Sequence, residues 1–254
     1  MSSLLSSRRG FGSSRRLPGY SLANCGVALL LLTALLVLSG CRYPTDIEHS
    51  LENIRGKVLN VGLTENPPWV MRSDNGPAGL EPEIVAALAE ELDAEVHWHW
   101  GSESALLQAL EERQLHLVIG GLTKHSRLSE LAAPTKPYHE SVYTVGYPSD
   151  TEVPASLKDE NVAIHPVNHF IKALRDEGAN PQRHTELADA DTAVAAPIWW
   201  LQAHGFKPGE WELATDQHVM ALPKGENAWM LTVQRHLDDQ THIGQRLQQL
   251  EADR

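Results

Sequence analysis

From Lys57 onward the sequence alternates between strand-like and helix-like hydrophobic periods, and this alternation restricts the possible folds most strongly. Residues 57–63 (KVLNVGL) read as a strand, and residues 80–92 (LEPEIVAALAEEL) read as an amphipathic helix. Residues 95–100 (EVHWHW) alternate as a strand, residues 102–114 (SESALLQALEERQ) form a serine-capped helix, and residues 115–121 (LHLVIGG) are an apolar run. This βαβαβ order predicts an α/β fold built on a doubly wound sheet.

Ligands of doubly wound sheets bind beyond the carboxyl ends of the strands, and this rule selects two loops here. Residues 64–70 (TENPPWV) form a turn, stiffened by consecutive prolines, that presents Trp69. In residues 120–126 (GGLTKHS), Gly120 and Gly121 would let backbone N–H groups approach a ligand. The competing interpretation makes Trp69 a core aromatic residue and the two glycines packing devices.

Two further tryptophans lie in the strand-like segment at residues 95–100. Trp98 and Trp100 are two residues apart and therefore share one face of the strand, with His97 and His99 on the other. We expect both tryptophans to pack in the core.

The thirteen histidines raise the hypothesis of a metal site. His165 and His169 have helical spacing, and His97 and His99 share a strand face, but Pro166 interrupts the first pair. We therefore expect scattered, solvated histidines, with no metal and no cofactor.

The N-terminus has the pattern of an export signal. Residues 1–26 contain four arginines and no acidic residue, and the apolar run at residues 27–38 (VALLLLTALLVL) is 12 residues long. A membrane-spanning helix needs about 20 apolar residues, so the run matches a signal peptide better. The segment LSGC at 38–41 resembles the lipobox of bacterial lipoproteins, which implies that Cys41 becomes the lipid-carrying first residue. The resemblance implies a periplasm-facing lipoprotein, and Arg42 in place of Asp favours the outer membrane.

Removal of residues 1–41 leaves 213 residues with 17 Lys and Arg against 33 Asp and Glu, a net charge of −16. Such an acidic protein is a poor partner for nucleic acid. Both cysteines, Cys25 and Cys41, lie in the export segment, so the mature chain forms no internal disulfide. We expect residues 42–56 to be a polar tether and the remainder to form one large domain or two lobes.

Residues 56–138 resemble the first lobe of the type 2 periplasmic solute-binding proteins, in the family 3 group that includes amino-acid receptors of ABC importers. The resemblance rests on the order of GKVLNVGL, NPPW, GLEPEIVAALAEEL, LLQALEERQLHLVIGGLT and KPY. Residues 157–174 and 189–205 are similar to strand and helix units of the second lobe, and residues 218–237 to the return strand and closing helix.

This resemblance implies a two-lobed fold in which each lobe holds a mixed, doubly wound sheet. Lobe 1 would comprise residues 57–141 and 217–254, and lobe 2 residues 142–216. The two crossings between lobes would be hinge strands near TVGYP (144–148) and TDQHV (215–219).

The α-amino-acid clamp of those receptors does not align with this chain. A gapless alignment places Leu128 at the position of the receptors' arginine, and Arg127 one residue early, about 100° around a helix. Ala196 replaces the aspartate that receives an α-amino group, and Val167 replaces a Gly of the second-lobe anchor. We expect Arg127 to be a surface residue, the alternative being a carboxylate clamp. The resemblance and the loops together predict ligand contacts from Asn66, Trp69, Glu81, Gly121, Leu122, Thr123, His125 and Asn168.

The resemblance implies a monomeric solute-binding protein that closes around a small polar solute and serves ABC-type uptake. One alternative is a sensor or adaptor without transport, and another is a cyclohexadienyl-dehydratase-like enzyme with Glu81 or Glu83 as general base. We expect no enzymatic activity, because no G-x-S-x-G, H-E-x-x-H, P-loop or dinucleotide fingerprint is present. Some related folds precede a lysozyme-like transglycosylase domain, for which we expect no room before Arg254.

Overall fold

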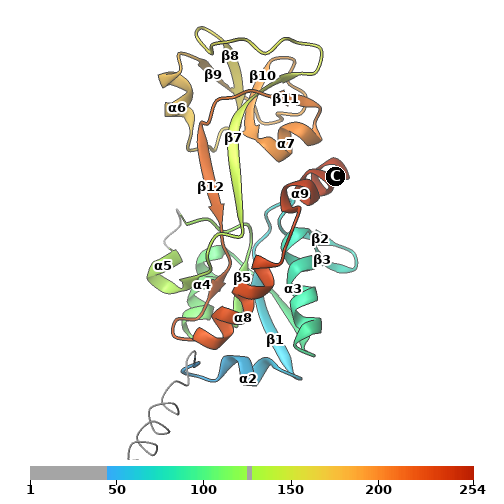
Figure 1. Ribbon diagram of the computed structural model, residues 1–254, viewed down its shortest axis with the longest axis vertical. Helices are drawn as coiled ribbons and strands as arrows, with labels where there is room; N and C mark the ends of the chain where they lie inside the picture. The colour runs from blue at the N-terminus through green and yellow to red at the C-terminus, as the bar shows by residue number, and fades with distance from the viewer. Residues whose placement is uncertain (1–44, 125–127) are drawn as a thin grey trace, which may run out of the picture. The chain divides into compact units, whose positions relative to one another are not determined.

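The computed structural model describes residues 45–124 and 128–254, which form two large β-sheets, each with its own helices, and a small two-stranded sheet (Figure 1). The strand order of the first sheet is β4 (Glu95–Trp100), β1 (Val58–Leu63), β5 (Leu117–Ile119), β13 (Ala221–Leu222), β6 (Ala133–Pro134). β1 lies parallel to β4 and β5, and β13 runs antiparallel to β5 and β6, so this sheet is mixed, as expected for lobe 1.

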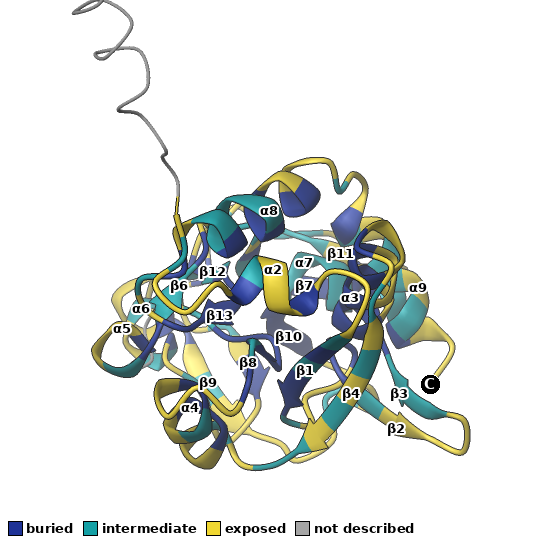
Figure 2. Ribbon diagram, turned by 90° about the horizontal axis from the view of Figure 1, so that it is seen from below, coloured by how far each residue is buried: buried dark blue, intermediate teal, exposed yellow. Residues whose placement is uncertain are grey.

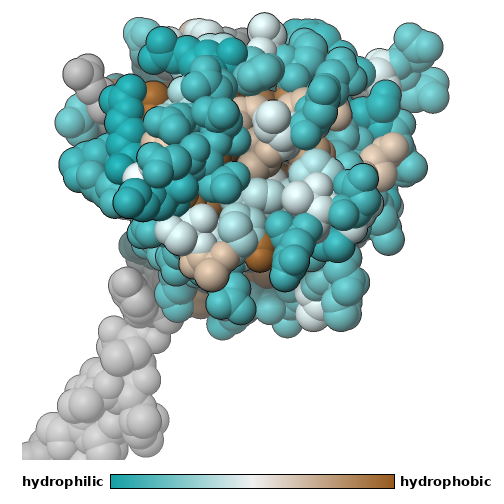
Figure 3. Space-filling model, turned by 90° about the horizontal axis from the view of Figure 1, so that it is seen from above, coloured by the Kyte–Doolittle hydropathy of each residue, from teal (hydrophilic) through white to brown (hydrophobic). Residues whose placement is uncertain are grey.

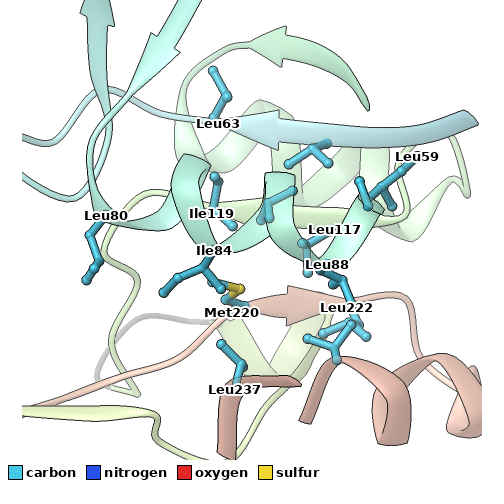
Figure 4. Packing of buried hydrophobic residues seen from close by; sticks show 14 of the residues in the cluster. Leu59, Leu63, Leu80, Ile84, Leu88, Leu117, Ile119, Met220, Leu222 and Leu237 are labelled. Carbon is cyan, nitrogen blue, oxygen red and sulfur yellow. The ribbon is translucent and has the colours of Figure 1, made fainter. Parts of the chain in front are cut away.

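Helices cover both faces of the first sheet. Helices α3 (Leu80–Glu91) and α8 (Asn227–Asp238) share one core cluster with Leu59, Val61 and Leu63, which alternate onto one face of β1. Figure 4 shows Leu59 and Leu63 in the same packed cluster as Ile84 and Leu88 of α3. The other face packs on α4 (Glu103–Glu111) and α5 (Leu128–Leu131). These helices on opposite faces make the sheet doubly wound.

The structure confirms the predicted βαβαβ order from β1 to β5. Ser102 caps α4, because its hydroxyl oxygen accepts a hydrogen bond from the Ala105 N–H at 3.4 Å. Trp98 and Trp100 are half-buried against the core, and His97 and His99 are exposed, as predicted. Figure 2 shows that exposed and half-buried residues alternate along β4, whereas β1 is mostly buried.

The second sheet is also mixed. Its strand order is β11 (Phe206–Pro208), β7 (His139–Pro148), β10 (Ala193–Pro197), β8 (Asn161–Ile164), β9 (Asn180–Arg183), and β12 (Ala214–His218) pairs with β7 as well. β10 runs parallel to β8 but antiparallel to β7. Two helices accompany this sheet, α6 (Ile171–Asp176) and α7 (Ile198–Ala203).

Strands β7 and β12 run side by side between the two groups of elements (Figure 1). Their pairing extends from His139↔His218 to Tyr143↔Ala214. The second predicted crossing, residues 215–219, coincides with β12. The first predicted crossing, residues 144–148, is the C-terminal half of β7, which pairs with β10 and β11, and the N-terminal half of β7 pairs with β12.

Several elements were not predicted: α2 (Ser50–Ile54), the hairpin of β2 (Met71–Ser73) and β3 (Gly76–Ala78), and α9 (Ile243–Ala252). The first of these changes the description of the tether. Asp46 Oδ1 accepts the N–H groups of Ala228 and Trp229 at 2.6 and 3.0 Å, and Glu226 accepts those of Glu48 and Ser50. Asp46 lies at the N-terminus of α8, where a carboxylate is favoured. Residues 46–54 are therefore bonded to the first lobe.

The described residues include no helix long and apolar enough to cross a membrane. The face drawn in Figure 3 is mostly hydrophilic, with smaller apolar patches between the polar residues.

Candidate functional site

The loop after β1 folds back on itself and on the glycine turn after β5. Asn66 and Val70 exchange two backbone hydrogen bonds of 2.9 and 3.0 Å. The Asn66 side-chain Nδ2 donates to the carbonyl of Gly120 at 2.9 Å. Gly121 has φ +64°, and a Cβ there would lie 2.6 Å from Asn66 Nδ2 and 2.8 Å from Trp69 Cδ1. Glycine is therefore required for both conformation and space.

Glu81 accepts hydrogen bonds from the backbone of the glycine turn. Its carboxylate is fully buried, and Oε2 accepts the N–H groups of Gly120 and Gly121 at 2.6 and 2.8 Å. Oε1 accepts the Tyr138 hydroxyl at 2.5 Å. Burial raises the pKa of Glu81 to about 7, although the three hydrogen bonds oppose the shift. The two N–H groups that the sequence offered to a ligand thus donate to a carboxylate of the protein.

Trp69 lies inside an aromatic cluster at the junction of the sheets, and only 4% of it is exposed. Its ring stacks on His218 of β12, with the centroids 3.9 Å apart and the planes at 25°. Trp199 of α7 lies edge-on to the Trp69 ring, with the ring centroids 6.4 Å apart, and Tyr138 lies edge-on to it with a centroid distance of 6.3 Å. These contacts involve both the first loop and the second sheet's helix.

Polar groups under this cluster form a chain between the two sheets. His218 Nδ1 lies 3.3 Å from the Gly121 carbonyl, and His218 Nε2 lies 2.9 Å from Ser141 Oγ. Ser141 Oγ also accepts the Trp199 indole N–H at 3.2 Å. Burial, together with neighbouring His139, lowers the pKa of His218 to about 3. The imidazole is therefore neutral at physiological pH, with one nitrogen as donor and one as acceptor.

Sequence reasoning did not identify His139, Ser141, Trp199 or His218. Three of them, His139, Ser141 and His218, lie on β7 and β12, the strands that connect the lobes. The sequence feature that could have indicated this cluster is His218 in TDQHV, because these residues were expected to form a hinge strand.

The remaining predicted contacts lie in different surroundings. The Leu122 side chain belongs to the core cluster beside α4, and its carbonyl accepts the Val219 N–H. Thr123 is half-buried and forms a β-bridge with His218. Asn168, in the loop after β8, donates through Nδ2 to the His165 carbonyl at 2.8 Å. His125, Arg127 and Cys41 lie outside the described residues.

A cavity of about 650 Å³ opens next to the aromatic cluster. Of the predicted contact residues that the structure describes, none lines it. Its walls come from the first loop, the second sheet and the C-terminal helix, namely Pro67, His165, Thr185, Glu186, Leu187, Ala188, Trp199, Trp200, Ala203, His204, Glu251, Ala252 and Arg254.

The cavity combines aromatic faces with polar groups, some of which already have partners. Glu251 is buried, and it accepts hydrogen bonds from His204 Nε2 at 3.1 Å and from Arg254 Nη1 at 2.7 Å. The rings of Trp200 and His204 are in contact, with their centroids 4.1 Å apart and their planes at 32°. Such a cavity has the size and the mixed lining typical of sites that bind small molecules.

Curated relatives match part of the chain. Membrane-bound lytic murein transglycosylase F of Aliivibrio fischeri is 27% identical over 175 residues, which cover 65% of this chain and 35% of the relative. The protein of the same name from Vibrio cholerae is 31% identical over 121 residues, covering 46% of this chain and 23% of the relative. The chain thus spans about a third or less of the length of these relatives.

Solved structures share the fold. The L-cystine solute receptor of Neisseria gonorrhoeae, in its unliganded open conformation, superposes with a TM-score of 0.63 at 14% identity, covering 76% of this chain and 90% of the receptor. An ancestral cationic amino-acid solute-binding protein superposes with a TM-score of 0.62 at 16% identity, covering 81% of this chain and 97% of the ancestral protein. Both structures support the two-lobed architecture predicted from the sequence.

Residues 59–248 match the family model described as bacterial extracellular solute-binding proteins, family 3. This match covers most of the chain and agrees with the fold of the solved structures. The chain therefore belongs to the family 3 bacterial extracellular solute-binding proteins.

Proposed function

We propose that this protein is a lipid-anchored solute-binding protein that closes around a small polar solute and delivers it to an ABC-type importer. The observation that carries the proposal is the 650 Å³ cavity, whose walls combine Pro67 and α9 with α7. Movement about β7 and β12 would open and close such a cavity, as in hinge-type closure.

A solute screen by thermal shift on the purified protein tests this proposal. A ligand at 100 times its Kd adds about 2.7 kcal/mol to the free energy of unfolding. We expect Trp200→Ala to weaken binding of a hit by roughly 1 to 3 kcal/mol, because Trp200 lines the cavity. The matched control is Trp211→Ala. Trp211 is a half-buried tryptophan of the same lobe and does not line the cavity. Equal affinity losses in both variants would argue against this site.

A second candidate is a sensor or adaptor that binds a solute without transport. The similarity of 65% of the chain to a lytic murein transglycosylase favours it and suggests a murein fragment as the solute. Solute uptake by a deletion strain separates the two candidates. Normal uptake of the identified ligand would favour the sensor, and lost uptake would favour transport.

A catalytic role has less support from the residues. Glu81 is engaged by three donors, and Glu83 forms a bidentate ion pair with Arg246 at 2.6 and 3.0 Å, so both proposed bases are occupied. The Ser141–His218 pair has a nucleophile-like geometry, but an imidazole with a pKa of about 3 is a weak base. Unchanged ligand recovered after long incubation is the expected result, and turnover would revive the enzyme hypothesis.

A further inference from the structure

A second cavity, of about 240 Å³, lies at the carboxyl ends of β8 and β10 in the second sheet. It shares His165, Leu187 and Trp200 with the larger cavity, so the two cavities adjoin each other. A solute held in the larger cavity is therefore next to this one.

The lining of the smaller cavity is mainly apolar and less polar than that of the larger cavity, with the His165 imidazole and the Tyr143 hydroxyl as its polar side-chain groups. Tyr143, Phe170, Ala196, Pro197 and Trp200 contribute rings, methyl and methylene groups. The Tyr143 hydroxyl already hydrogen-bonds to Asp216. No carboxylate, lysine or arginine is among the described residues that line it, so no acidic or strongly basic side chain forms an ion pair with a ligand here.

The size of the cavity indicates what it can hold. An apolar cavity of about 150 Å³ already accommodates benzene and stays free of water. The larger cavity, by contrast, has His204, Glu251 and Arg254 in its wall. The two cavities thus offer an apolar subsite next to a polar one.

We propose that the solute is amphipathic, with a polar part in the larger cavity and a branched alkyl group or single aromatic ring seated against Ala196 in the smaller one. This inference rests on the proposed solute-binding function and specifies its ligand class. Loss of the apolar group should weaken binding by about tenfold to a hundredfold, the factor expected for burying one such group.

Fragment binding to the purified protein, measured by ligand-observed NMR, tests the inference with p-cresol, indole and isobutyramide against the polar fragment glycinamide. We expect the apolar fragments to bind at least tenfold more tightly than glycinamide. Ala196→Leu fills the subsite and Ala196→Asp introduces a carboxylate, so both should abolish this binding. Ala155→Leu, at an exposed alanine of the same lobe, controls for added surface hydrophobicity and should leave it unchanged.

Ala196 is only 4% exposed, so the larger substitutions can disturb folding. Ala196→Val is therefore included and should give an intermediate, graded loss, with circular dichroism checking the fold of each variant. If polar library hits bind while fragment affinity is the same in wild type and Ala196→Val or Leu, the amphipathic inference is overturned and solute binding stands. If neither library solutes nor fragments bind, the solute-binding proposal fails as well.

Discussion

His204 of α7 lies 3.1 Å from Glu251 of α9, and this contact joins the helix of the second sheet to the C-terminal helix. The other side of α9 belongs to the first lobe, because Leu247 is fully buried in its core and Arg246 pairs with Glu83 of α3. Helix α9 therefore contacts elements of both lobes beside the larger cavity.

Glu251→Ala should lower the free energy of unfolding by about 1 to 2 kcal/mol, since His204 and Arg254 both lose their acceptor. Chemical denaturation measures the change. Glu177→Ala, at an exposed glutamate, should stay within about 0.5 kcal/mol of the unaltered protein. Equal effects of the two substitutions would contradict a bridging role for Glu251.

Trp69→Ala should destabilise the fold by roughly 3 to 5 kcal/mol, because the ring is buried between His218, Trp199 and Tyr138. Trp98→Ala, at a half-buried position on the edge strand, should cost less. Melting temperatures compare the two. A variant at Trp69 that keeps its stability but loses ligand affinity would instead support a direct ligand contact.

Glu81 should make the folded state less stable as pH rises. Its pKa is about 7 in the folded protein, above the ordinary 4.5, so between these values the folded state retains a proton that the unfolded state has lost. Stability should fall by up to about 3 kcal/mol over this range and level off above pH 7. The difference in free energy of unfolding between the unaltered protein and Glu81→Gln isolates the effect. A constant difference from pH 4.5 to 7.5 would refute it.

His218 should act in the opposite direction, because its folded pKa of about 3 lies below the ordinary 6.5. Its contribution to stability is present above pH 6.5 and is lost as pH falls toward 3. In NMR titrations the His218 ring proton signals should keep their neutral positions down to about pH 4. Titration near pH 6 would show that the ring is not buried between Trp69 and Ser141.

Cys41→Ser should leave the protein without lipid, since a thioether linkage requires the sulfur. We expect uncleaved precursor or released protein on membrane fractionation, and mass spectrometry of the unaltered protein should find an acylated mature N-terminus. Membrane-bound mature protein without lipid would rule out the lipobox assignment. Cys25→Ser is the matched control and should not change acylation, because it lies before the apolar run.

Strands β1 and β4 and helices α3 and α4 followed from the sequence because each has one buried face that imposes its own period, whereas β5 was recognised as a continuous apolar run. Leu59, Val61 and Leu63 had to alternate in β1, and Trp98 and Trp100 had to share a face in β4. Short elements without such a period, including the β2–β3 hairpin and α2, gave no comparable signal.

The site depended on contacts between residues far apart in the chain. Glu81 and Glu83 are neighbours on α3, yet one is buried under the glycine turn and the other pairs at the surface with Arg246, 163 residues later. Trp69 and His218 stack across a similarly long separation. Local periodicity determined which segments became strands and helices and which fold class they built. Only the tertiary structure decided which polar groups bind one another and which line a cavity, because burial and partners are set by packing between distant segments.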